Sequence, residues 1–304
     1  MRLLKTLIGS LLTVLIVLTI VFFMVRLAPG GPFDTERAIS QEQREILQKT
    51  YGLDRPLVEQ YARFIGKIFR GDWGVSMALE GQSVGEILSR AFPVSLMLGV
   101  SALAIAVGFG IPLGFFWAAN PVPKTRPVPS HALYLFTMLP SFVLAPIAQQ
   151  IVLLCGGVAY GYEGIKSLFW PSLVLGLYYL PFVARLTQVG FQEESRALYF
   201  RVAQAKGLSR VAALWRHGYK AALGPVLAYL GPTAAGLITG AFVVETVWGL
   251  PGLGRFFVNA VFNRDDTLLL GLVAFYTVIL VFFNAAIEII LARWNPAMRK
   301  IEGK

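Results

Sequence analysis

Apolar residues are concentrated in six long runs along the chain. Apolar runs of eighteen or more residues predict membrane-spanning helices, because about twenty residues are needed to cross roughly 30 Å of hydrocarbon. The predicted spans cover residues 7–27, 94–118, 132–155, 171–190, 223–248 and 268–292. The pattern predicts an all-α, polytopic membrane protein with six transmembrane helices.

The first run begins like a secretory signal peptide, with the basic residues Arg2 and Lys5. Its apolar core, however, is about twice as long as that of a cleavable signal. The sequence that follows, RLAPGGP, contains no small-x-small cleavage site. We therefore expect residues 1–27 to be a short cytoplasmic start followed by a retained transmembrane helix.

Residues 28–92 form a more polar segment between the first and second predicted spans. Ser40 followed by Gln43 fits a capping box, and Gly52 stands where a helix ending near Tyr51 needs a left-handed residue. These signals predict an external helical insert after the first span.

A second helix in this insert is predicted to start at Pro56 and to end before Gly71. Proline is favoured in the first turn, where its missing N–H is not needed. The apolar face of the helix consists of Leu57, Tyr61, Phe64, Ile65 and Ile68. We expect this face to pack on the outer mouth of the helix bundle. A functional interpretation is that it also contacts an external partner protein.

Composition supports a chain that lies in lipid. Hydrophobic residues make up 56% of the sequence and charged residues only 14%. A soluble chain of this length would need a largely polar surface. The composition therefore excludes an ordinary soluble domain.

The net charge of +10 is unevenly distributed between two sets of segments. One set holds fourteen Lys or Arg against three Asp or Glu, and the other holds eleven against twelve. The first set is the amino terminus and residues 119–130, 191–222 and 293–304, and the second is residues 28–92, 156–169 and 250–266. By the positive-inside rule, the first set and both termini are predicted to be cytoplasmic. This distribution argues against a nucleic-acid partner.

One short motif suggests catalysis: GQSVG at residues 81–85 matches the G-x-S-x-G nucleophile elbow. That elbow requires a buried strand before the serine and a helix after it, whereas Ser83 lies in the polar stretch MALEGQSVGEIL. The two histidines, His131 and His217, are on the predicted cytoplasmic side. A membrane hydrolase using Ser83 is therefore disfavoured.

Other catalytic and cofactor motifs are missing from the sequence. It contains no G-x-x-x-x-G-K-[ST] loop, no H-E-x-x-H motif and no Cys/His cluster with zinc spacing. The single cysteine, Cys155, cannot form an intrachain disulfide. We expect neither a catalytic residue nor a bound cofactor on this chain.

Ionisable residues are rare inside the predicted spans, where Arg185, Glu245 and Glu288 lie toward the ends. This weighs against a carrier driven by protons or sodium through buried charges. Glu245 precedes the stretch TVWGLPGLG, and a carboxylate at this depth should face protein or water. We expect Glu245, Pro251, Gly252 and Gly254 to shape the external exit or gate of the fifth span. For Glu245, a structural hydrogen bond to loop backbone is the alternative.

The stretch AQAKGLSRVAALWRHGYKAALGPV, residues 203–226, is basic and rich in alanine. The sequence predicts a helix up to Lys206, a break at Gly207 and a second helix starting at Ser209. Because Gly207 has no Cβ, we expect it to adopt a positive φ. The small side chains of Ala203 and Ala205 would allow close approach of a partner. A basic loop held by anionic lipid is the alternative interpretation.

A series of motifs occurs in order along nearly the whole chain: RLAPGGPF, YGLDRPLVEQYARFI, GDWGVSM, IPLGF, PSFVLAP, YFRVAQAKGLSRVAALWRHGYKAAL and VVETVWGLPGLGRFFVNAVFNRD. The series resembles the inner-membrane permease subunits of binding-protein-dependent ABC importers, in the oligopeptide/dipeptide branch. The Glu-Ala-Ala opening of the broader family's cytoplasmic loop is Arg201-Val202-Ala203 here.

The resemblance implies a type I ABC importer permease in a bacterial inner membrane, with both termini cytoplasmic. Residues 93–292 would form the permease core, with a coupling loop at residues 191–222 and a cytoplasmic tail at residues 293–304. Arg201, Ala203, Ala205, Lys206 and Gly207 would contact an ATPase subunit.

The implied partners are a second homologous permease, two ATPase subunits that carry ATP and Mg, an external substrate-binding protein, a peptide substrate and the lipid bilayer. A secondary carrier or channel that works without ATPase subunits remains the alternative function.

Overall fold

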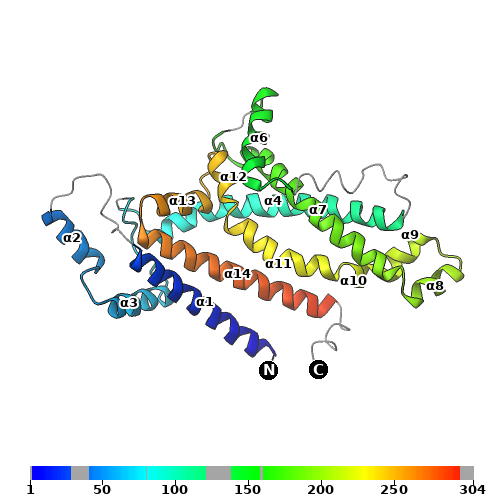
Figure 1. Ribbon diagram of the computed structural model, residues 1–304, viewed down its shortest axis with the longest axis horizontal. Coiled ribbons are helices and arrows are strands. Elements are labelled where there is room, and N and C mark those ends of the chain that lie inside the picture. Colours follow the sequence, from blue (N-terminus) through cyan, green and yellow to red (C-terminus); the bar gives the residue numbers. More distant parts are fainter. Residues whose placement is uncertain (1, 29–40, 80, 121–137, 158–159, 295–304) are drawn as a thin grey trace. The chain divides into compact units, whose positions relative to one another are not determined.

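The computed structural model describes residues 2–28, 41–79, 81–120, 138–157 and 160–294. The chain divides into two compact units. Unit 1 comprises Met1–Val94 and Pro251–Val281, and unit 2 comprises Ser95–Leu250 and Phe282–Lys304. Figure 1 shows that helices account for the regular structure of the described residues, which confirms the all-α prediction.

Five helical segments are long and apolar enough to cross a membrane: Ile8–Leu27, Val84–Ala119, Ile165–Glu194, Gly224–Val247 and Asp266–Leu291. They correspond to the first, second, fourth, fifth and sixth predicted spans, which are thereby confirmed as apolar helices.

The third predicted span lies only partly within the described residues. Its residues 132–137 fall outside them, and the described part contains the apolar helix α6, Ser141–Leu154.

The fifth predicted span is not one continuous helix, although the sequence suggested one. Helix α11, Gly224–Gly240, is followed by the short helix α12, Phe242–Val247. Between them Ala241 has φ −71° and ψ 58°, far from the helical ψ of about −42°. Glycine costs up to about 1 kcal/mol relative to alanine inside a helix, so Gly240 weakens the helix at this point.

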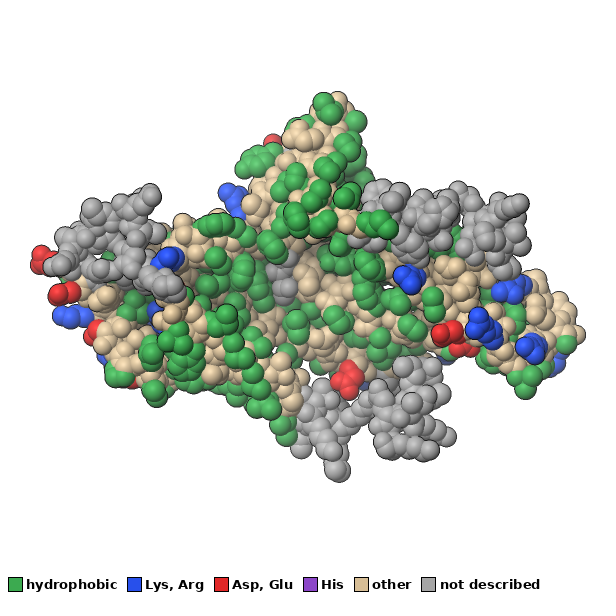
Figure 2. Space-filling view, viewed as in Figure 1, with side chains coloured by type: hydrophobic (Ala, Val, Ile, Leu, Met, Phe, Trp, Pro, Cys, Tyr) green, Lys and Arg blue, Asp and Glu red, His purple; other side chains and the backbone are tan. Residues whose placement is uncertain are grey.

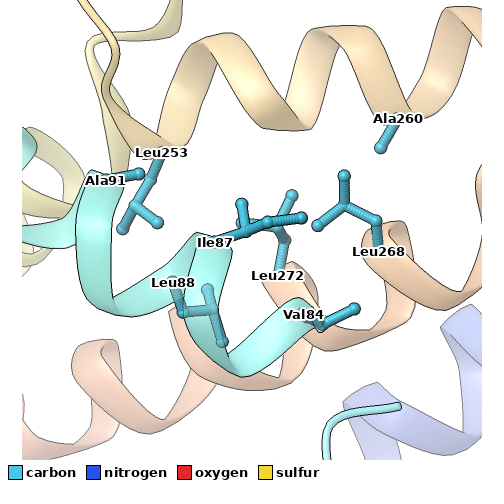
Figure 3. Packing of buried hydrophobic residues seen from close by; sticks show 8 residues of the cluster. All are labelled: Val84, Ile87, Leu88, Ala91, Leu253, Ala260, Leu268 and Leu272. Atoms are coloured by element: carbon cyan, nitrogen blue, oxygen red, sulfur yellow. The ribbon is translucent and has the colours of Figure 1, made fainter. Parts of the chain in front are cut away.

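The core of unit 1 joins the start of α4, Val84–Ala119, to α13, Leu253–Phe262, and to the start of α14, Asp266–Trp294. Figure 3 shows the eight buried side chains of this cluster: Val84, Ile87, Leu88, Ala91, Leu253, Ala260, Leu268 and Leu272. The residues that α4 contributes recur at helical spacing, so they form one apolar stripe. Residues far apart in the sequence therefore share one core.

Helices α2, Gln41–Tyr51, and α3, Leu57–Phe69, form the insert and belong to unit 1 with α1, Arg2–Leu27. The predicted helix ends are confirmed, because Gly52 has φ 66° and Gly71 has φ 75°. Pro56 is the residue before α3 rather than its first residue. The predicted capping box at Ser40 lies outside the described residues.

The apolar face of α3 packs against α1, a candidate membrane span. The ring of Phe64 stacks on that of Phe22 with centroids 5.5 Å apart, and Tyr61 lies 5.4 Å from Phe22. The Tyr61 hydroxyl also lies within 2.6 Å of Thr19 Oγ1. These contacts hold the insert on the first span.

A buried carboxylate, Asp265, closes the loop before α4. It accepts hydrogen bonds from Ser76 Oγ, from Met77 N at 3.0 Å and from Ala78 N at 3.1 Å. It also accepts one from Leu268 N at 3.0 Å, and so caps the start of α14. One side chain thereby fixes two distant segments of unit 1.

Close helix packing in unit 2 depends on residues without side chains. Helix α7, Phe169–Glu194, packs against α6, α11 and the short helix α10, Tyr219–Ala222. A Cβ at Gly114 of α4 would overlap the carbonyl oxygen of Ala184, and one at Gly190 would overlap that of Ala222. Two helices can approach α7 this closely only because glycine stands at each contact.

Candidate functional site

The predicted cytoplasmic loop folds into a compact knob, defined here as residues 198–222. It consists of α8, Leu198–Ala205, a turn, α9, Arg210–Ala213, the π-helical segment η3, Leu214–Gly218, and α10. The prediction of a helix, a glycine break and a second helix is confirmed. Ser209 precedes α9 and accepts a hydrogen bond from Ala212 N at 3.3 Å, which makes it the N-cap.

Gly207 ends α8 in the left-handed conformation that was predicted, with φ 88°. The N–H of Gly207 donates to Gln204 O at 2.9 Å, and the N–H of Leu208 donates to Ala203 O at 3.2 Å. This pair of bonds is the Schellman motif, which commonly ends helices at glycine. The conformation of Gly207 therefore sets the direction in which the chain leaves α8.

The interior of the knob packs against the ends of α4 and α7. Its buried side chains, together with those they contact, are Ala118, Ala119, Phe191, Phe200, Ala203, Ala213, Leu214 and Ala222. Arg210 Nη2 donates a hydrogen bond to Ala118 O at 3.3 Å. The Cζ atom of Arg210 lies 5.7 Å from the centroid of the Phe200 ring. Ala203 is only 6% exposed, so its small side chain is required by this core.

Aromatic rings extend this core to the end of α14. The ring centroid of Trp215 lies 5.2 Å from that of Phe115 in α4 and 6.1 Å from that of Tyr219. Tyr219 in turn lies 6.0 Å from Trp294, whose Nε1 donates to Lys220 O at 2.9 Å. The knob is thus attached to the ends of three membrane-spanning helices.

The outer surface of the knob combines positive charge with apolar side chains. Arg201, Ala205, Lys206 and Gly207 are exposed together on α8 and the following turn, whereas Ala203 is not. Figure 2 shows Lys and Arg side chains gathered over α8 and α9. Of the five predicted coupling residues, four therefore share one surface.

Two residues of this surface were missed at the sequence level. Leu198 is 76% exposed and Val202 is 47% exposed, one helical turn apart on α8. The signal was present, because Phe200 and Ala203 occupy the opposite side of the same helix. Two exposed apolar residues beside cations are a surface suited to contact with another protein.

Tyr199 connects this surface to the end of α7. Its hydroxyl donates a hydrogen bond to Glu194 Oε2. Burial and this bond to a carboxylate raise the pKa of Tyr199 above its ordinary value. The phenol therefore stays protonated and keeps donating at neutral pH.

The predicted exit of the fifth span contains a completely buried carboxylate, that of Glu245 in α12. Ser95 Oγ of α4 donates a hydrogen bond to Glu245 Oε1 at 2.7 Å. The residues that follow Glu245 are held through their carbonyl groups, because Gln149 Nε2 donates to Val247 O at 2.7 Å and Gly161 N donates to Trp248 O at 3.0 Å. The carboxylate faces protein, as expected at this depth.

The other predicted exit residues belong to unit 1. The boundary between the units falls between Leu250 and Pro251, so Pro251, Gly252 and Gly254 belong to unit 1 and Glu245 to unit 2. Gly252 precedes α13, and Gly254 is buried in its first turn. These residues thus lie at and just before the start of α13.

The catalytic motif considered above has a structural role. Ser83 Oγ accepts a hydrogen bond from Glu86 N at 3.1 Å and so caps the start of α4. Its backbone pairs with Val75 in an isolated antiparallel bridge, not in a buried strand. Across the described ranges, His, Cys, Asp and Glu form no cluster of three that could hold a metal ion.

Comparison with known proteins covers nearly the whole chain. Residues 1–98 match the N-terminal model of binding-protein-dependent transport system membrane components. Residues 110–300 match the binding-protein-dependent transport system inner membrane component family.

Several relatives match over nearly the full length of the chain. The chain is 36% identical to the oligopeptide transport system permease protein OppB of Haemophilus influenzae over 97% of the chain and 98% of the relative. It is 35% identical to OppB of Escherichia coli K12 over 94% of the chain and 95% of the relative. It is 32% identical to the dipeptide transport system permease protein DppB of Bacillus subtilis over 94% of the chain and 94% of the relative. The chain therefore belongs to the family of inner membrane components of binding-protein-dependent transport systems, and is a multi-pass transport subunit rather than an enzyme.

Proposed function

We propose that this permease subunit forms part of the translocation pathway of an ATP-driven importer for peptides. The similar proteins are named for oligopeptide and dipeptide transport, and they match the chain over nearly its full length. A second homologous permease and an external substrate-binding protein would complete the pathway. Two ATPase subunits would carry ATP and Mg, because this chain has no phosphate-binding loop.

The observation that carries the proposal is the construction of the knob. Its outer surface exposes Leu198, Arg201 and Val202, while its inner side is attached to α4, α7 and α14. When two ATPase subunits close on ATP, a partner groove that holds this surface would displace the knob. Packed cores switch between discrete arrangements and do not deform continuously. The displacement of the knob would therefore be passed through its core to the membrane-spanning helices.

The proposed orientation puts both termini and the knob in the cytoplasm and residues 28–92 outside. The charge distribution supports it. After replacement of Cys155 by serine, Gln43→Cys should react with an impermeant thiol reagent in spheroplasts, whereas Ser209→Cys should react only after permeabilisation. Labelling of Ser209→Cys in sealed spheroplasts would reverse the orientation.

The coupling role is tested by placing a charge in the apolar part of the surface. Val202→Glu should reduce both the co-purification of ATPase subunits and ATP-driven peptide uptake into vesicles, while the chain inserts at its normal level. The matched control is Val58→Glu, since Val58 is a 75% exposed valine of the insert. Equal uptake by the two variants would refute the coupling role. Uptake by the chain without any ATPase would instead indicate a carrier or channel.

A further inference from the structure

A pocket of about 490 Å³ lies inside unit 1, where two membrane-spanning helices end beside the insert. Arg26, in the last turn of α1, lines the pocket, as do Thr267 and Leu270 near the start of α14. Both helices are candidate membrane spans. Where two spans leave the hydrocarbon together, the surrounding lipid presents its head groups.

The polar lining of this pocket is rich in cations. Its basic residues are Arg26, Lys49, Arg55, Arg63 and Lys67. Three carboxylates pair with some of them: Asp266 with Arg26 at 2.8 Å, Glu59 with Arg55 and Arg63, and Asp72 with Lys67 at 3.7 Å. Lys49 makes no ion pair with any described residue. The lining therefore keeps a positive excess suited to an anion.

Two buried polar atoms of the lining residues have unmet hydrogen-bonding capacity. Arg26 Nε, a donor, and Gln60 Oε1, an acceptor, have no hydrogen-bond partner among the described residues. The amide nitrogen of Gln60 is already used, because it donates to Leu53 O at 3.1 Å and to Arg55 O at 2.8 Å. A ligand that satisfies both atoms must offer an acceptor to Arg26 and a hydrogen-bond donor, such as a hydroxyl group, to Gln60.

The lining also has an apolar part with three aromatic rings. It includes Phe22, Phe64, Ile68, Trp73 and Leu270. Inorganic phosphate or a small carboxylate would gain nothing from these side chains. A molecule with an anionic head and an attached hydrocarbon part would use both halves of the pocket.

We propose that this pocket binds the head group of an anionic phospholipid whose phosphodiester is esterified to a hydroxylated alcohol, as in phosphatidylglycerol. The phosphate lies among the pocket cations, and a hydroxyl group of the head donates to Gln60. In the proposed orientation the lipid belongs to the outer leaflet. Bound there, it would connect α1, the insert and the start of α14.

Direct titration of the full chain in neutral detergent tests this site. Short-chain dioctanoyl phosphatidylglycerol should bind more tightly than dioctanoyl phosphatidylcholine, whose head group is zwitterionic. The double variant Lys49→Gln/Lys67→Gln should weaken phosphatidylglycerol binding by about fivefold for each cation removed. The control is Arg70→Gln/Arg90→Gln, which removes the same charge from exposed positions of unit 1 outside the pocket lining. The control should bind like the unmodified chain.

Three results would overturn the proposal. The first is equal affinity for the two lipids, and the second is equal loss of binding in both double variants. The third is binding of glycerol phosphate as tight as that of the lipid, which would assign the pocket to a soluble phosphate.

A salt titration needs no variant: raising sodium chloride from about 0.05 M to about 0.5 M should weaken phosphatidylglycerol binding selectively. Because no partner subunit is present, these outcomes are independent of peptide import.

Discussion

Replacing Gly207 with valine is expected to disable the knob without unfolding the chain. Gly207 has φ 88°, and an ideal Cβ built there meets no atom within 4 Å. The damage must therefore come from backbone conformation and not from collision. A left-handed conformation costs an L-residue roughly 1–2 kcal/mol, and a β-branched side chain tolerates it worst.

The structure indicates what this strain would break. If the chain leaves the left-handed region, the bonds from Gly207 N to Gln204 O and from Leu208 N to Ala203 O are lost, each worth about 1 kcal/mol net. A cost of one or two kcal/mol lowers the population of the native turn by a factor of about 5–30. Leu208 would then leave the core around Ala203, and α8 would be displaced.

The assay compares three variants in sealed vesicles containing the partner subunits. Gly207→Val should lose most ATP-driven uptake and co-purify less ATPase, and Gly207→Ala should be intermediate. Gly207→Asn should retain most activity, because asparagine tolerates the left-handed region. Gly66→Val is the control, since Gly66 lies inside α3 at ordinary helical φ with nothing within 4 Å of its Cβ position.

Two results would refute this reasoning. Normal uptake and normal ATPase co-purification with Gly207→Val would mean that the turn does not transmit force. Equal damage from valine and asparagine would mean that close approach of a partner, and not φ, requires the glycine.

Three further substitutions separate structural roles from functional ones. Ala203→Trp should lower the thermal unfolding midpoint of the purified chain because Ala203 is buried. Ala205→Trp should leave this midpoint unchanged and weaken only the co-purification of ATPase subunits. If both variants unfold at the same midpoint, the argument from burial is wrong. Asp265→Ala should lower the free energy of unfolding by at least about 3 kcal/mol, since four donors lose a buried acceptor. Chemical unfolding measures this loss, and a loss below about 1 kcal/mol would contradict the prediction. Glu245→Gln keeps the shape and can still accept from Ser95, so unchanged uptake would indicate a structural role, while lost uptake with unchanged stability would indicate gating.

Local features of this fold followed from the sequence. Apolar run length predicted five described spans, and glycine positions predicted the ends of α2, α3 and α8. The positive φ angles of Gly52 and Gly207 were predicted as well. These features depend on residues close together in the chain. The amphipathic pattern of α3 likewise identified the face that packs on α1.

Features that depend on contacts between residues far apart in the chain could not be predicted from the sequence. Periodicity shows that Ala203 lies on one side of a helix, but not that Phe191 and Leu214 cover that side. Ser95 and Glu245 are 150 residues apart, so nothing local links the hydroxyl to the carboxylate. The interruption at Ala241 was also missed, since an apolar run reads the same whether its helix is continuous or broken.

The carboxylate of Asp265 has a consequence for the order of events during synthesis. Ala78, whose N–H it accepts, precedes it by 187 residues. At about 5–20 residues per second, roughly 10–40 s pass between the synthesis of the two residues. Throughout that interval the loop before α4 lacks its acceptor, and α13 and α14 have yet to join the core around Ile87. The insert is made early and completed late, so a chain that stops before residue 265 should leave the ribosome with this loop open to proteases.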